Sequence, residues 1–351
     1  MKQTLRDFLC PQPKSKIKAG DGQLKGAYNF YTSSQIQSKF YHSATYTQPA
    51  LIFGTGGMAS VHYCNEPFST STDCLVMYGR LGAPLELIYY YLRSNMHLLQ
   101  DGFKGAGLQH ISKDYILNIN INMPAPSLQE QITHQMRLID AMINGKKQQI
   151  LSFDEAVKSR FIELFGDPDG NPMNWETAEL ERHLEIVGGF AFKSEGFTES
   201  GIPVLRIGNI NSGHFLPVNM VFWPDDPSLA RYKMYPGDLV MSLTGTVGKD
   251  DYGNVCVLSD EYPEYYLNQR NAKLAIGATL NRHYLSEMLK FSRIKKRLTG
   301  ISRGVRQANI SNRDILALRV PIPPIKLQEQ FATFVEQTDK SKLFDEMEVA
   351  A

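Results

Sequence analysis

A block of 21 residues occurs twice in this chain, and this repeat constrains the fold more than any other feature. The first copy covers residues 111–131 and the second covers residues 310–330, so the copies lie 199 residues apart and align without a gap. Nine of the 21 positions are identical, whereas ordinary residue usage would give about one or two matches. The chain therefore contains a duplicated unit.

A weaker similarity precedes the repeat. The segments that begin at Pro49 and at Pro236 each place an apolar strand before a Thr-Gly turn. Within the repeat, apolar alternation over 119–123 and over 318–322 predicts a strand, and prolines then interrupt the pattern before a helix begins. The predicted order is domain, helix, domain, helix, and the predicted fold class is mixed α/β (α+β).

The first of the two predicted helices is long. Its apolar residues recur at spacings of three, four and seven, which is typical of a helix that packs along another helix. We expect about 38 residues at about 1.5 Å each, beginning at a Ser127–Glu130 capping box and ending before Gly166. The apolar seam consists of Leu128, Ile132, Met136, Ile139, Ile143, Ile150, Phe153, Val157 and Phe161.

The second predicted helix starts near Lys326 and carries Leu327, Phe331 and Val335. An isolated amphipathic helix needs a partner for its apolar face, and the other copy is the candidate within the chain. We expect the two helices to pack as an antiparallel coiled coil with these residues at its interface. A coiled linker without a partner is the alternative.

The composition is that of a soluble globular protein with room for two or three domains, because 42% of the 351 residues are hydrophobic and 21% are charged. No apolar run is long enough to cross a bilayer, and the N-terminal segment lacks a signal-peptide pattern. We therefore expect a cytoplasmic protein that is not bound to a membrane. The four cysteines form no C-x-x-C pair, so no metal site is predicted.

Charge is balanced over the whole chain but not locally. The net charge is +1, which is low for a protein that binds nucleic acid on its own. Between Lys290 and Arg319, however, nine basic residues accompany the single acid Asp314. This segment is either a stripe that contacts phosphates or an ordinary solvated helical face.

No catalytic motif is present. No lysine follows an acidic residue by two positions, and the chain has no phosphate-binding G-x-x-x-x-G-K loop and no H-E-x-x-H motif. The Gly54–Gly57 segment lacks the further glycine and the acidic residue of a dinucleotide site. It is either a turn whose Thr55 and backbone amides face a phosphate or a purely structural turn. We expect no catalytic residue in this chain.

Several motifs resemble those of the specificity subunits of type I restriction–modification systems. The two strand-to-helix junctions, 124–132 and 321–331, resemble those of this family, and K-S-R-F-I-E-L-F-G-D-P at 158–168 resembles the end of its central helix. G-I-P-V-L-R-I-G-N-I at 201–210 and R-G-V-R-Q-A-N-I-S at 303–311 are similar to the opening and close of a target-recognition domain. The resemblance implies recognition domains at 1–123 and 169–322, and conserved helices at 124–168 and 323–351.

The resemblance also implies a function and partners. The chain would read an asymmetric, bipartite site in double-stranded DNA and would direct adenine methylation or restriction by other subunits. Two methyltransferase subunits would dock on the helices, and ATP-driven restriction subunits would join outside them. S-adenosylmethionine, ATP and Mg would be bound by those partners, and the helix pair would set the spacer between the half-sites.

Candidate DNA contacts follow from side-chain chemistry. Arginine suits guanine, and asparagine or glutamine suits adenine, in the major groove, while other basic side chains hold phosphates. In the second domain we expect base contacts from Arg206, Asn209, Gln269, Arg270 and Gln307, and phosphate contacts from Lys295, Lys296, Arg303 and Arg306. In the first domain we expect contacts from Tyr31, Ser33, Thr55, Lys104 and Gln109.

Other functions stay open at this point. The chain could be the specificity subunit of a modification-only methyltransferase, or a scaffold of two globular domains on a coiled coil that binds protein instead of DNA. Salt-dependent, sequence-selective duplex binding would separate the scaffold from the DNA-reading functions.

Overall fold

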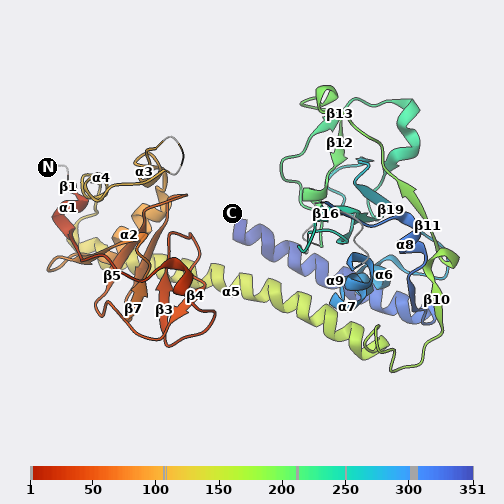
Figure 1. Ribbon diagram of the computed structural model, residues 1–351, viewed down its shortest axis with the longest axis horizontal. Coiled ribbons are helices and arrows are strands. Elements are labelled where there is room, and N and C mark those ends of the chain that lie inside the picture. The colour runs from red at the N-terminus through yellow and green to blue at the C-terminus, as the bar shows by residue number, and fades with distance from the viewer. Residues whose placement is uncertain are drawn as a thin grey trace. The chain divides into compact units, whose positions relative to one another are not determined.

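The computed structural model describes residues 3–105, 107, 109–210, 213–249, 251–300 and 307–350, with the side chains of 307 and 343–350 left out. Two compact units divide the chain, residues 1–144 and residues 145–351, and both are mixed α/β (Figure 1). Among the described residues, no helix combines the length and the apolar character that spanning a membrane requires.

The first unit is built on two small sheets. Of its described strands, four form an antiparallel sheet in the order β2–β8–β5–β6, and the others include a parallel β3–β7 pair with β4 at its side. All five residues of the central strand β5 are buried. The strands are β1 (Gln3–Thr4), β2 (Leu9–Pro11), β3 (Tyr28–Tyr31), β4 (Lys39–Tyr41), β5 (Ala50–Gly54), β6 (Val61–Cys64), β7 (Phe68–Thr70), β8 (Cys74–Gly79) and β9 (Asn120–Ile121). The helices are α1 (Leu5–Phe8), α2 (Leu85–Ser94), α3 (His97–Gln100) and α4 (Lys113–Leu117).

The second unit has the same plan. Its main sheet has the order β11–β19–β15–β17, and its second sheet contains the parallel β12–β18 pair. The strands are β10 (Thr177–Glu179), β11 (Leu184–Gly188), β12 (Ile202–Leu205), β13 (Phe222–Trp223), β14 (Lys233–Met234), β15 (Leu239–Ser242), β16 (Thr244–Thr246), β17 (Val255–Val257), β18 (Tyr265–Leu267), β19 (Asn271–Ile276), β20 (Gln307–Asn309) and β21 (Arg319–Pro321). The helices are α6 (Arg282–Lys290), α7 (Ser292–Thr299) and α8 (Asn312–Leu316).

The two units are copies of one another in topology. Each closes with a short antiparallel pair, β1–β9 in the first unit and β10–β21 in the second. The second strand of each pair follows a one-turn helix capped by the serine that the repeat preserves: Ser112 accepts from the backbone of Tyr115, and Ser311 accepts from the backbone of Asp314. The duplication predicted from the sequence is confirmed in the sheet order.

Two long helices follow the repeated junctions, α5 (Pro126–Phe165) and α9 (Ile325–Ala350). Helix α5 begins one residue before Ser127, so the expected capping box at that serine is wrong. The physical reason is that Pro126 occupies the first turn, where its missing N–H costs nothing. The expected end is confirmed, because Gly166 adopts a φ of +76° directly after Phe165.

Within the second unit the C-terminal part of α5 packs against α9 (Figure 1). The rings of Phe161 and Phe331 lie 5.5 Å apart, and Lys342 binds Asp154 at 2.7 Å. Asp154 precedes Phe161 in α5, whereas Lys342 follows Phe331 in α9, so these segments pair antiparallel. The predicted helix pair is confirmed over this stretch.

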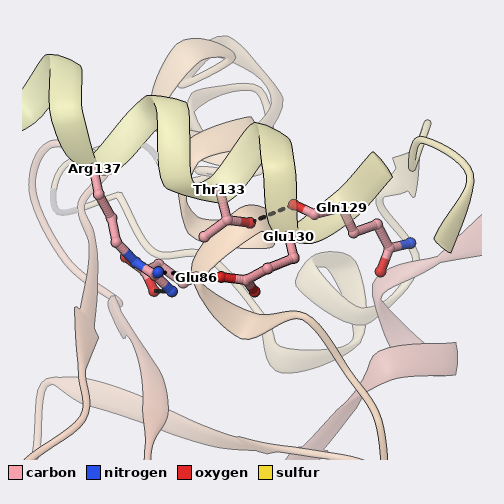
Figure 2. A network of polar contacts seen from close by, with 5 residues as sticks. All are labelled: Glu86, Gln129, Glu130, Thr133 and Arg137. Atoms are coloured by element: carbon pink, nitrogen blue, oxygen red, sulfur yellow. Dashed lines mark hydrogen bonds and ion pairs between the residues drawn. The ribbon is translucent and has the colours of Figure 1, made fainter. Parts of the chain in front are cut away.

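In the first unit a polar network fixes the start of α5 on α2. Figure 2 shows Arg137 of α5 reaching Glu86 of α2 with two parallel hydrogen bonds of 2.8 and 2.7 Å. The same guanidinium contacts Glu130 at 3.3 Å, and Arg93 of α2 binds Asp140 at 2.8 Å. A bidentate Arg–carboxylate pair fixes orientation as well as distance. This end of α5 is therefore held in a defined orientation on its own domain.

Candidate nucleic-acid interface

In each unit the Thr-Gly turn after the central strand pairs with the segment that closes the domain. In the first unit Gly56 bridges to His110, which also bridges to Lys104. In the second unit β16 pairs with β20, and Gly245 lies opposite Ala308. The two turns that correspond in sequence therefore also make corresponding backbone pairings. These pairings bring together candidate contacts from distant parts of the sequence.

Four candidate residues of the first unit lie at or beside this turn. The hydroxyls of Ser33 and Thr55 donate to the same carbonyl, that of Asp73, at 2.8 and 2.9 Å. The carbonyl of Thr55 contacts Nδ1 of His110 at 3.0 Å, and the backbones of His110 and Lys104 exchange two hydrogen bonds. The side chains of Lys104 and of Gln109 are exposed beside this pairing.

Tyr31 does not join them at the surface. It is 6% exposed, and its ring packs against His62 and Phe68 with centroids 5.1 and 5.7 Å away. Burial raises the pKa of its hydroxyl far above the usual range. The structure gives Tyr31 a packing role, because β3 turns this side chain into the core.

In the second unit, Asn209 is also a core residue. It is 1% exposed, and its side-chain oxygen accepts from the backbone N–H of Arg206 at 3.0 Å. Its amide donates to the carbonyls of Leu216 and Val218, each at 3.0 Å. These bonds use the groups that were expected to read adenine, so the structure assigns Asn209 to loop support. Arg206, which is half-buried, donates to the carbonyl of Asn219.

Gln269 and Arg270 are exposed at the turn between β18 and β19. The backbone of Arg270 accepts from Leu243 at 2.8 Å, and the backbone of Gln269 donates to Phe190 at 2.9 Å. Leu243 directly precedes Thr244, so this turn lies beside the β16–β20 ladder. Gln307 belongs to β20, although its side chain is outside the described residues.

Some basic side chains of α7 make hydrogen bonds within the unit. Lys295 donates to Asn254 at 2.7 Å, and Arg297 donates to the carbonyl of Arg319 at 2.9 Å. Lys296 is exposed and stays a candidate phosphate contact. Arg303 and Arg306 lie outside the described residues.

A cavity of about 730 Å³ in the first unit adds residues that the sequence interpretation missed. Thr55, His110, Lys14 and Lys113 are among the residues that line it, together with Ser112. Two lysines at one cavity favour an anionic ligand such as a phosphate. The alternation of lysines at 14, 16 and 18 was the available signal, but only the fold brings that segment next to Thr55. In the described part of the chain no cluster of three or more His, Cys, Asp or Glu side chains could hold a metal ion.

The predicted helix-interface residues fall into two groups. In the second unit Val157, Phe161, Phe331 and Val335 are buried together, with Leu327 packed against them. The remaining seam residues of α5 are half-buried, apart from the more exposed pair Leu128 and Ile139, at 47% and 48%. These half-buried residues are Ile132, Met136, Ile143, Ile150 and Phe153.

Comparison with known proteins finds sequence similarity to DNA specificity proteins. A family model described as "Type I restriction modification DNA specificity domain" matches residues 3–152 and 172–346. A putative type I restriction enzyme MjaX specificity subunit from Methanocaldococcus jannaschii is 25% identical over 174 residues, which are 48% of this chain and 40% of that protein. The type I restriction enzyme EcoKI specificity subunit from Escherichia coli K12 is 22% identical over 183 residues, 49% of this chain and 38% of that protein. The matches span about two fifths of the length of these relatives.

A solved structure shares the fold. The crystal structure of the type I restriction–modification S subunit from M. genitalium superposes with a TM-score of 0.63 at 15% identity, covering 100% of this chain and 92% of that one. At this level of identity the likeness supports the fold alone.

Proposed function

The chain belongs to the type I restriction modification DNA specificity family, and from that premise we propose that it reads a bipartite, asymmetric site in double-stranded DNA for partner subunits that methylate or cut. The two units would each read one half-site. Because their loops differ in sequence, the two half-sites would differ as well.

One observation carries the proposal most directly. Each unit has a Thr-Gly turn that pairs with its closing segment and has exposed polar side chains beside it, on the closing segment in the first unit and on the β18–β19 turn in the second. Lys104 and Gln109 supply them in the first unit, and Gln269 and Arg270 supply them in the second. Cationic and amide side chains are the groups that bind phosphates and read base edges.

The chemistry would belong to the partners. We propose two methyltransferase subunits that bind S-adenosylmethionine, with restriction subunits that use ATP and Mg, and no catalytic residue in this chain. The exposed seam residues Leu128 and Ile139 of α5 offer apolar surface on which such partners would pack. The protein would act in the cytoplasm on the DNA it meets there.

The experiment is a selection from a random double-stranded DNA pool. The full chain is used together with the methyltransferase subunit of its own system, at two salt concentrations. We expect a bipartite consensus with two different halves, and an affinity that falls steeply with salt. Retention of no sequence above background would contradict the DNA-reading function and favour a protein scaffold. Methylation mapping in cells that do or do not carry restriction subunits would separate a full restriction system from a modification-only one.

A further inference from the structure

The two Thr-Gly turns share a feature that their polar residues do not explain: each presents an apolar side chain to solvent. Met58 is 67% exposed and Val247 is 40% exposed. Each lies two residues beyond the glycine that pairs with the closing segment of its unit, Gly56 or Gly245. The two positions are thus equivalent within the duplicated architecture.

Both side chains sit on loops that are firmly held. In the first unit Gln35 donates to the carbonyl of Ala59 at 3.0 Å, and the backbone of Ala59 donates to Gln100 at 3.1 Å. Gly57, with a φ of +81°, makes the bend directly before Met58. Since its flanking backbone is fixed in this way, Met58 is held outward by the fold.

In the second loop, different residues hold the backbone around Val247. The backbone of Thr246 donates to the Asp251 carboxylate at 2.8 Å, which lowers the pKa of that carboxyl, and the backbone of Lys249 donates back to Thr246 at 3.0 Å. Gly248, with a φ of +78°, completes the turn directly after Val247. Two loops that share little sequence beyond the Thr-Gly pair therefore each hold one apolar side chain in contact with solvent, beside the polar candidates.

We propose that Met58 and Val247 are specificity-determining residues that pack against the 5-methyl group of thymine, one in each half-site. This inference rests on the proposed function and adds to it. Apolar contact with the thymine methyl is one of the ways in which the major groove is read. An apolar side chain among hydrogen-bonding ones would recognise the thymine methyl group at a defined position, a group that Gln269 and Arg270 cannot recognise through hydrogen bonds.

The test compares Met58→Ser and Val247→Ser with the wild-type chain in selections from a random duplex pool. Leu24→Ser and Val218→Ser are the matched controls, since Leu24 is 86% exposed in the first unit and Val218 is 51% exposed in the second. We expect each test variant to lose about fourfold of its selectivity for thymine at one or two positions, the factor that burial of one methyl group contributes. The loss should be confined to one half-site, and to opposite half-sites for the two variants. The controls should keep the wild-type consensus.

A second measurement tests whether the 5-methyl group of thymine is the group that is recognised. In duplexes of the selected sequence, deoxyuridine replaces thymine at the affected positions. Wild type should then bind about fourfold more weakly, and the serine variants should bind both duplexes equally. Wild-type binding that ignores the substitution, or serine variants with an unchanged consensus, would overturn the inference while leaving DNA reading intact. A wild-type chain that selects no sequence would instead overturn the proposed function, and this inference with it.

Discussion

The side-chain amide of Gln328 donates to the carbonyl of Pro323 at 2.7 Å. The same bond joins Gln129 to Pro124 at 3.0 Å, 199 residues earlier in both members. In each copy the glutamine ties the first turn of a long helix to a carbonyl of the proline-containing junction that precedes the helix. This gives a physical reason for the first glutamine of the Leu-Gln-Glu-Gln sequence that the repeat preserves.

Replacing Gln328 by leucine should destabilise the second unit. Gln328 is fully buried and also accepts from the backbone of Asn281 at 2.8 Å, so the substitution leaves buried polar groups unpaired. We expect the free energy of unfolding to fall by about 2–4 kcal/mol. Both tryptophans, Trp175 and Trp223, lie in the second unit, so their fluorescence in urea reports on it. Gln129→Leu in the first unit is the control, and an equal shift of the tryptophan transition there would contradict the local explanation.

Phe161→Ala should be among the most damaging core changes. The ring of Phe161 is fully buried and contacts Tyr284 and Phe331 with centroids 5.4 and 5.5 Å away. Truncation leaves a cavity between α5 and α9, and we expect a loss of about 3–5 kcal/mol in the urea unfolding of the second unit. Its neighbour Ile162 is 43% exposed, so Ile162→Ala should cost less than about 1 kcal/mol. Similar costs for the two variants would argue against the helix pairing described above.

The stability of the second unit should fall as the pH is lowered from about 7.5 to 5.5. Burial lowers the pKa of His283 from its usual value, and the nearby carboxylate of Glu336, 3.4 Å away, offsets this only in part. The folded state therefore prefers the neutral ring: its stabilisation is complete above the unfolded pKa of about 6.5 and is lost as the pH falls below that value. Urea titrations followed by tryptophan fluorescence should show this slope, and His283→Gln should flatten it. An unchanged slope in the variant would place the titration elsewhere.

Substitutions of Asn209 and of Gln269 should have opposite effects on stability and on DNA selectivity. Asn209→Ala removes three buried hydrogen bonds to the backbone and should lower the unfolding free energy by about 2–3 kcal/mol. Gln269 is exposed, so Gln269→Ala should leave the urea midpoint unchanged and relax one position of the selected DNA consensus. Should Gln269→Ala destabilise the protein and keep the consensus, Gln269 would be a structural residue as well.

The sequence was most informative where a local rule controls the outcome. The stop at Gly166 and the strand before each proline depend on a few neighbouring residues, and both appear in the structure. The start of α5 was misassigned because Pro126 and Ser127 both carry helix-start signals, and only backbone geometry decides between them. Tyr31 and Asn209 were misassigned because residue type indicates what a side chain can bind, but not which way the strand or loop points it.

The amino-acid sequence by itself determined the duplication, the order of domains and helices and the family, since these follow from residue identity and spacing along the chain. The tertiary structure alone decided which side chains face solvent together. Thr55 meets His110, and Leu243 meets Arg270, through backbone pairings between segments far apart in the chain. Such contacts depend on how strands are ordered in a sheet, and no local pattern encodes that order.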